Sequence, residues 1–215
     1  MKRIRLLFGT FTFLAITVFS VAGVERRPWH LDVVIFSPDE SDRRLTSTRE
    51  AIGFWNRTLL DLKLRVRLIE VNVVHNSPMM RPLENYARRI SHGAGRLEPF
   101  DAEPNVPTEL IKLDGDIVIL LSKQRLMSFA WPFGESGKYF IAIRSGFEKT
   151  MNQTNLLQNV VAHELGHALG LKHNSDTTAL MCGPCRTSAL SFEERRFFRL
   201  LPQDQARLLS LYRAH

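Results

Sequence analysis

The chain has 215 residues, of which 44% are hydrophobic, so it is long enough for one domain with its own core. Its 29 basic and 22 acidic residues give a formal net charge of +7, which falls to +4 without the N-terminal Lys2, Arg3 and Arg5. A charge this mild does not require a nucleic-acid partner, and we find no nucleic-acid-binding motif, so we expect none.

The first 22 residues predict a targeting segment. Three basic residues precede an uncharged apolar run at 6–22, and Ser20 and Ala22 offer small side chains for cleavage. We therefore expect a signal peptide at 1–22 and a secreted or periplasmic mature chain, 23–215. The alternative is an uncleaved anchor at 6–22, which is at the short edge of what spans a bilayer. Only in that case do we expect the chain to associate with a membrane.

Hydrophobic patterns predict alternating strands and helices along the rest of the chain. In chain order we expect a strand at 31–36, a helix at 41–60, a strand at 65–74, a short helix near 83–90, a strand at 116–121, two short strands at 127–131 and 138–144, and helices at 155–169 and 201–212. The run at 116–121 is nearly all apolar, which is typical of a central parallel strand.

The segment 163–173, HELGHALGLKH, fits one chemistry. His163 and His167 are four residues apart and share one face of a helix, so their imidazoles can reach the same metal ion. Gly170 can take a positive φ and end the helix, which would bring His173 back as a third ligand. Glu164 can then contact a water molecule at the open fourth position. The alternative is a buried helix that happens to carry histidines.

This motif resembles the zinc signature of the metzincin metallopeptidases. Met181 stands where that family has its Met-turn methionine, and Asp176 and the closing helix at 201–212 resemble the matrixin branch in particular. Asn174 departs from the usual matrixin residue. The resemblance implies an α+β (α/β-like) metzincin fold with a twisted five-stranded mixed sheet and three main helices. It also implies an upper lobe at about 30–169, a small C-terminal lobe at about 170–215, and a cleft between them.

The segment Phe129-Ala130-Trp131 resembles the edge strand above the matrixin cleft. An exposed sheet edge can bind an extended peptide by strand addition. The alternative is an edge that Pro132 and its neighbours protect from such pairing.

Cys182 and Cys185 are the only cysteines and form the string Cys-Gly-Pro-Cys. In an exported chain a short-range disulfide is the expected state. A reduced pair, a second metal site and a redox role are the alternatives, although the thioredoxin motif of the same sequence opens a helix. Cys182 and Gly183 replace an aromatic residue and a proline that line the main substrate pocket of matrixins, so the shape of that pocket is not predicted.

The resemblance implies an exported zinc endopeptidase with one catalytic Zn²⁺ held by His163, His167 and His173, and with Glu164 as general base. Its substrate would be a protein or peptide, and we expect a monomer. The sequence does not support a structural zinc or a calcium site. Two alternatives are a non-proteolytic peptide-binding module of the same fold and a thiol–disulfide oxidoreductase that uses Cys182 and Cys185.

Overall fold

A computed structural model describes residues 30–93, 105–134, 137–146, 151–185 and 197–213, without the side chains of 151–154. The expected targeting segment at 1–22 lies outside the described residues. Within them, no helix has both the length and the apolar character needed to cross a membrane.

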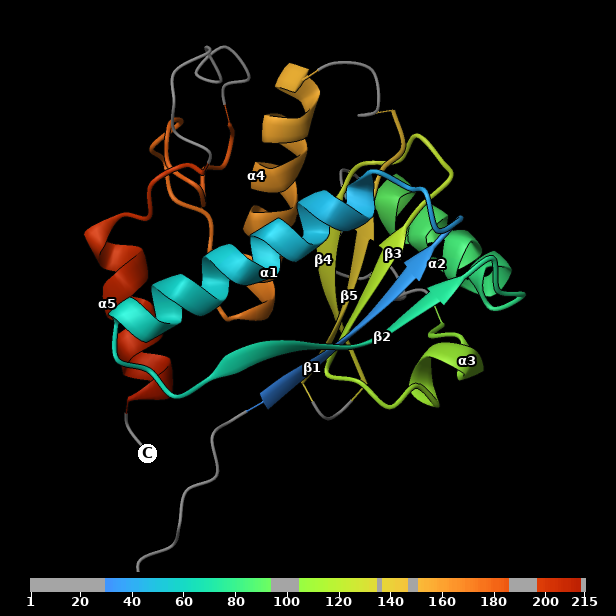
Figure 1. The fold of residues 1–215 in the computed structure, drawn as a ribbon, viewed down its shortest axis with the longest axis horizontal. Coiled ribbons are helices and arrows are strands. Elements are labelled where there is room, and N and C mark those ends of the chain that lie inside the picture. Colours follow the sequence, from blue (N-terminus) through green and yellow to red (C-terminus); the bar gives the residue numbers. More distant parts are fainter. Residues whose placement is uncertain (1–29, 94–104, 135–136, 147–150, 186–196, 214–215) are drawn as a thin grey trace, which may run out of the picture.

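A single five-stranded sheet forms the centre of the described structure (Figure 1). Its strands are β1 (His30–Ser37), β2 (Arg67–His75), β3 (Ile117–Leu121), β4 (Phe129–Phe133) and β5 (Lys138–Ile143). They lie in the order β2-β1-β3-β5-β4, and all neighbours are parallel except β4, which pairs antiparallel with β5. The predicted α+β fold with a five-stranded mixed sheet is therefore confirmed.

Strand β3 lies at the centre of the sheet, and each of its five residues is at most 1% exposed. Ile117 and Ile119 pack into the hydrophobic cluster on one face, whereas Val118 and Leu120 pack into the cluster on the other. All side chains of a strand that is covered on both faces are buried, which is why its sequence is a continuous apolar run.

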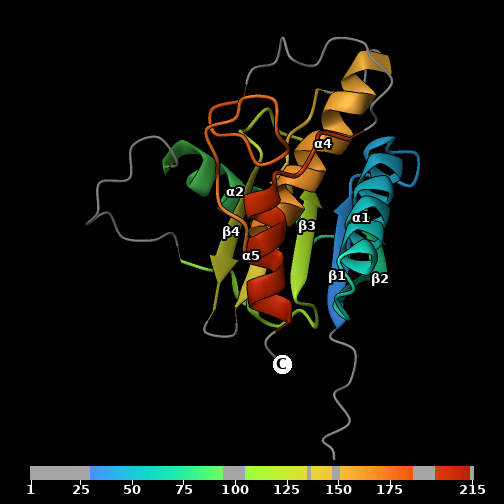
Figure 2. The ribbon, with the colours of Figure 1, turned by 90° about the vertical axis from the view of Figure 1, so that its left-hand side faces the viewer.

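Helices cover both faces of the sheet (Figures 1 and 2). They are α1 (Arg44–Asp61), α2 (Met80–Gly93), the short α3 (Thr108–Ile111), α4 (Met151–Ala168) and α5 (Pro202–Tyr212). Buried residues of α1, α4 and α5 share one cluster, and those of α2 and α3 share the other. Figure 2 shows α5 against the C-terminal end of α4, where the Tyr212 hydroxyl donates to the Leu169 carbonyl oxygen at 3.2 Å.

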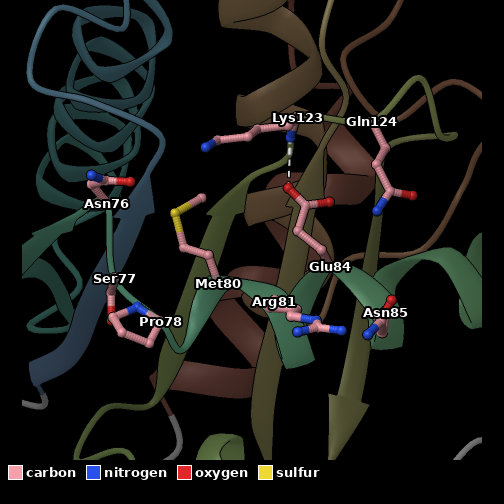
Figure 3. Close-up of a pocket in the computed structure, with 9 residues that line it drawn as sticks. All are labelled: Asn76, Ser77, Pro78, Met80, Arg81, Glu84, Asn85, Lys123 and Gln124. Carbon is pink, nitrogen blue, oxygen red and sulfur yellow. Dashed lines mark hydrogen bonds between the residues drawn. The ribbon is translucent and has the colours of Figure 1, made fainter.

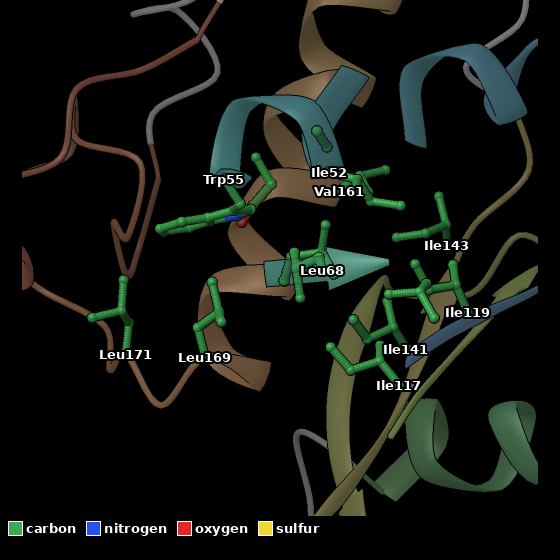
Figure 4. Close-up of a cluster of buried hydrophobic side chains, with 14 of the residues drawn as sticks. Ile52, Trp55, Leu68, Ile117, Ile119, Ile141, Ile143, Val161, Leu169 and Leu171 are labelled. Carbon is green, nitrogen blue, oxygen red and sulfur yellow. Dashed lines mark hydrogen bonds between the residues drawn. The ribbon is translucent and has the colours of Figure 1, made fainter. Parts of the chain in front are cut away.

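Trp55 joins α1 to α4 inside the larger cluster (Figure 4). Its side chain is fully buried, and its indole N–H donates to the Ala162 carbonyl oxygen at 2.8 Å. Removal of so large a buried ring typically costs about 3–5 kcal/mol of folding free energy. Because Ala162 immediately precedes His163, this contact fixes the turn of α4 that carries the metal motif.

Arg44 joins the start of α1 to the carboxyl ends of β3 and β5. It is only 2% exposed, and its guanidinium donates to the carbonyl oxygens of Ser122 at 2.6 Å and Arg144 at 3.2 Å. Asp42 balances the buried charge with an ion pair at 2.6 Å. A buried cation is tolerated here because carbonyl and carboxylate oxygens satisfy its donors.

Prolines account for two of the differences between predicted and observed element ends. Strand β4 includes Pro132, which the predicted strand at 127–131 excluded, because a proline is tolerated on an edge strand. Helix α2 begins at Met80 and contains Pro82 in its first turn, where the missing N–H costs nothing. It is therefore longer than the predicted helix near 83–90.

Candidate metal centre

Helix α4 presents His163 and His167 on one face and then ends abruptly. The Gly170 N–H donates to the His167 carbonyl oxygen and the Leu171 N–H donates to the Gly166 carbonyl oxygen, both at 2.9 Å. This pair of hydrogen bonds is the Schellman pattern, in which the residue after the helix takes a left-handed conformation. Gly170 has a φ of +88°, and the turn returns the chain towards the two histidines.

The structure brings His163, His167 and His173 together. Their three Nε2 atoms form a triangle whose sides are all 3.1 Å. Each corner of such a triangle lies roughly 1.8 Å from its centre, so a point about 2.0–2.1 Å from all three nitrogens, the Zn–N distance, lies just outside its plane. The triangle is thus of the right size for one zinc ion.

The hydrogen bonds of the imidazoles also fit a cation. The Nδ1 atoms of His163 and His167 lie 2.7 Å from the Leu180 carbonyl oxygen and 3.0 Å from the Leu171 carbonyl oxygen. A carbonyl oxygen only accepts, so each Nδ1 carries the hydrogen and each Nε2 directs a lone pair into the triangle. Lone pairs this close repel one another unless a cation lies between them.

Burial keeps these imidazoles neutral, which is the form that binds metals. It lowers the pKa of His163 to about 4, although the hydrogen bond to the Leu180 carbonyl partly opposes this shift. Burial also lowers the pKa of His167 below its ordinary value. Neutral imidazoles near pH 7 can therefore bind an ion without first losing a proton.

Glu164 lies beside the triangle and is 7% exposed. Burial raises the pKa of its carboxyl group to about 8, and a hydrogen bond from the Ala130 backbone N–H partly opposes the rise. A cation held by the neighbouring histidines would favour the ionised form. The carboxyl group is thereby suited to exchange a proton near neutral pH.

Met181 packs beneath the helical turn that carries the two histidines. Its side chain is fully buried, and a Cβ atom added to Gly166 would lie 2.5 Å from its sulfur atom. The contact between helix and thioether therefore requires glycine at 166. The requirement was not predicted, although a glycine inside a helix is a known signal of close packing.

The segment after His173 is held by backbone hydrogen bonds to the Met181 turn. The Asn174 N–H donates to the Met181 carbonyl oxygen at 2.7 Å, and the Gly183 N–H donates to the Asn174 carbonyl oxygen at 2.8 Å. A Cβ atom added to Gly183 would lie 2.6–2.9 Å from three atoms of His173. The Asn174 amide also donates to the buried Asp204 of α5 at 3.3 Å. Sequence patterns gave no sign of these long-range supports.

A disulfide joins Cys182 and Cys185 beside the histidines. Cys182 is 2% exposed, whereas Cys185 is exposed. Two groups of three side chains among the described residues could hold an ion, and both contain His163: one is the histidine triangle and the other includes the two cysteines.

The predicted substrate edge, Phe129-Ala130-Trp131, lies in β4 at the edge of the sheet. Phe129 is buried, whereas Ala130 and Trp131 are half-buried. Ala130 also contributes the N–H that reaches Glu164, so this edge adjoins the metal centre directly. Both the substrate-binding interpretation and the protected-edge interpretation remain compatible with this placement.

A cavity of about 460 Å³ lies elsewhere, between the end of β2, the start of α2 and the residues after β3 (Figure 3). Its lining includes the exposed Arg81 and Lys123 and the buried Glu84, whose carboxylate accepts from the Lys123 backbone N–H at 2.6 Å. None of the three histidines lines it.

Comparisons with known proteins agree with this geometry. The family model of the matrixins, peptidase family M10, matches residues 96–213. Among solved structures, archaemetzincin from Methanopyrus kandleri is similar, with a TM-score of 0.50 and 13% identity over 87% of this chain and 98% of that chain. No curated protein sequence matches.

The fold and the site define a metzincin-type domain. More particularly, the chain belongs to the matrixin family, whose model matches more than half of its length. The predicted metzincin and matrixin resemblance is therefore confirmed. Membership of this family makes the chain a zinc metallopeptidase, a hydrolase that acts on proteins or peptides, and it implies a zinc ion as cofactor.

Proposed function

We propose that the chain is an exported zinc endopeptidase in which His163, His167 and His173 hold one catalytic ion and Glu164 is the general base. The observation that carries this proposal is the triangle of three Nε2 atoms with 3.1 Å sides. Zinc bound there supplies a Lewis acid that polarises the scissile carbonyl and lowers the pKa of a water molecule.

Glu164 moves the proton in this mechanism. Its carboxylate accepts a proton from the attacking water and then gives it to the leaving amine nitrogen. The Ala130 N–H orients the carboxylate, and burial raises the pKa of the carboxyl group towards neutral pH, where the group must both accept and release a proton. Met181 packs below the histidines as an apolar support and does not bind the ion.

The β4 edge aligns the substrate. A peptide in extended conformation would pair with the free side of Phe129–Trp131 and would present its scissile bond next to Glu164. Fixing the peptide in this way turns a random encounter into an oriented attack. A polypeptide bound along a sheet edge extends in both directions, which favours cleavage within chains rather than at their ends.

The decisive experiment compares Glu164→Gln with the parent chain. We expect the variant to retain its zinc, measured by metal analysis, and to lose cleavage of proteome-derived peptides by several orders of magnitude. Glu109→Gln, at an exposed position of α3, makes the same chemical change as a matched control and should leave cleavage unchanged. Unaltered cleavage by Glu164→Gln would refute the assigned role, and a chelator should abolish cleavage by the parent.

Export and release of the mature chain are tested separately. Expression of the full sequence in a secreting host should give a product that begins at Gly23, as read by intact mass. A product that retains 1–22 and sediments with membranes would support the anchored form instead.

A further inference from the structure

A second set of metal-binding side chains overlaps the histidine triangle. The sulfur atoms of Cys182 and Cys185 and a ring nitrogen of His163 all lie within 4.8 Å of one another. While the two sulfurs are joined in a disulfide, neither can act as a thiolate ligand. The disulfide therefore keeps two strong zinc ligands beside the metal centre in an inactive form.

We propose that reduction of the Cys182–Cys185 disulfide creates a mixed nitrogen–sulfur metal site, in which both thiolates bind a soft divalent ion together with His163. Thiolate and imidazole are the ligands that zinc and similar ions prefer in proteins. The reduced chain would then hold its ion through a ligand set that the oxidised chain cannot form.

The surrounding backbone fixes these ligands in reach of one another. Cys182 forms a parallel bridge with Asn174, and its N–H donates to the Ala179 carbonyl oxygen at 3.3 Å. The Cα atoms of the two cysteines are 5.0 Å apart. A tetrahedral zinc ion needs sulfur atoms roughly 3.8 Å apart and a nitrogen roughly 3.5 Å from each sulfur. Once the S–S bond is broken, side-chain rotation can provide these spacings without moving the Met181 turn.

The burial pattern also defines a route for reduction by a dithiol. A thiolate of the dithiol attacks the exposed Cys185 sulfur, forms a mixed disulfide and expels the Cys182 thiolate. The second thiol of the reductant then attacks the reductant's sulfur atom in the mixed disulfide and releases the Cys185 thiolate. Two electrons and two protons pass to the protein, the reductant leaves as its disulfide, and each protein thiol gives its proton to solvent when it binds the ion.

Because His163 belongs to both ligand sets, the two sites compete for one ion. An ion bound by two anionic thiolates is a weaker Lewis acid than one bound by three neutral imidazoles, and it no longer lies at the centre of the histidine triangle. We therefore expect the reduced chain to be a poor peptidase. This consequence rests on the proposed function, whereas the change of ligands does not.

Cobalt provides a readout of the ligands that is independent of activity. The mature chain is stripped of metal, and one half is reduced with a phosphine, which adds no competing thiol. The phosphine is removed without air, and Co²⁺ is then added to both halves. We expect thiolate-to-cobalt charge-transfer absorption in the near ultraviolet only in the reduced half. Zinc affinity, measured by chelator competition, should rise by about tenfold or more on reduction.

The Cys182→Ala/Cys185→Ala double variant is the matched control, and reduction should change neither its cobalt spectrum nor its zinc affinity. The comparison of oxidised and reduced parent needs no substitution, so it tests the proposed change of ligands even if the variant folds poorly. If thiol titration finds two free thiols per chain and the cobalt spectrum does not change, the proposal is refuted. Absence of peptide cleavage by the oxidised parent would instead refute the proposed function and leave the spectral result to stand on its own.

Discussion

Gly183 offers the sharpest test of how this chain positions its third histidine. A Cβ atom at this position would lie 2.6, 2.8 and 2.9 Å from the Cγ, Cβ and Nδ1 atoms of His173. Real Cβ atoms essentially never approach other atoms below 3.0 Å, and ordinary contact begins near 3.4 Å. In Gly183→Ala, either His173 or the disulfide loop must therefore move by roughly 0.5–0.8 Å.

A displacement of this size matters because metal–ligand distances tolerate only about ±0.2 Å. His163 and His167 are held by α4 and would remain in place, so a shift of His173 by this distance would take it out of the triangle. Groups that position a ligand without binding the ion typically contribute about 10–100-fold in metal affinity. We expect Gly183→Ala to weaken zinc binding by about this factor and to lower peptide cleavage in proportion to the zinc lost.

The assay is competition for zinc between the chain and a chromophoric chelator, at fixed pH and with the disulfide intact. Gly53→Ala in α1 is a matched control, because its added Cβ would meet only the flexible end of Arg57, at 3.3 Å. Zinc affinity of Gly183→Ala within about threefold of the parent would refute the positioning argument. So would weakened binding that Gly53→Ala reproduces, since that would reflect a general loss of stability.

Three further predictions concern stability. Arg44→Met should lower the free energy of unfolding by about 3–5 kcal/mol in urea titrations, because it leaves Asp42 and several carbonyl oxygens without their buried partner, whereas exposed Arg43→Met should change it little. In the metal-free chain the raised pKa of Glu164 stabilises the folded state below pH 4.5, and this stability is lost as the pH rises through about 8. Between these pH values the unfolding free energy of Glu164→Gln should therefore rise by up to roughly 5 kcal/mol relative to that of the parent. A difference that does not change with pH would contradict this. Asp204→Ala should cost about 1–3 kcal/mol in urea and also weaken zinc binding, in contrast to the exposed Gln203→Ala.

Local patterns were sufficient to predict the elements that carry the chemistry. Four-residue spacing placed His163 and His167 on one helical face, and the continuous apolar run of β3 indicated a strand buried on both sides. Such signals survive in a single sequence because each depends on neighbours within one or two turns of a helix or a few residues of a strand.

Contacts between distant segments were not predictable in the same way. The burial of Arg44 depends on carbonyl groups about 80–100 positions away, and no local pattern distinguishes this arginine from the exposed Arg43 beside it. The hydrogen bond from Ala130 to Glu164 joins an edge strand to a helix and has no sequence signature. The close packing of Gly166 against Met181 was also not predictable, because the sequence shows only that a glycine stands inside the helix.

The third histidine differs physically from the other two, and this difference links the metal centre to the end of the chain. The backbone of α4 places His163 and His167, whereas the placement of His173 depends on the left-handed turn at Gly170 and on the Met181 segment. Helix α5 supports both, since Arg207 donates to the Gly170 carbonyl oxygen and Asp204 accepts from the Asn174 amide. An ion bound by all three imidazoles stabilises only the state in which this support is in place, so metal binding must also stabilise the docking of α5. The closing helix is therefore part of what holds the ion, although it contributes no residue to either group of metal-binding side chains found among the described residues.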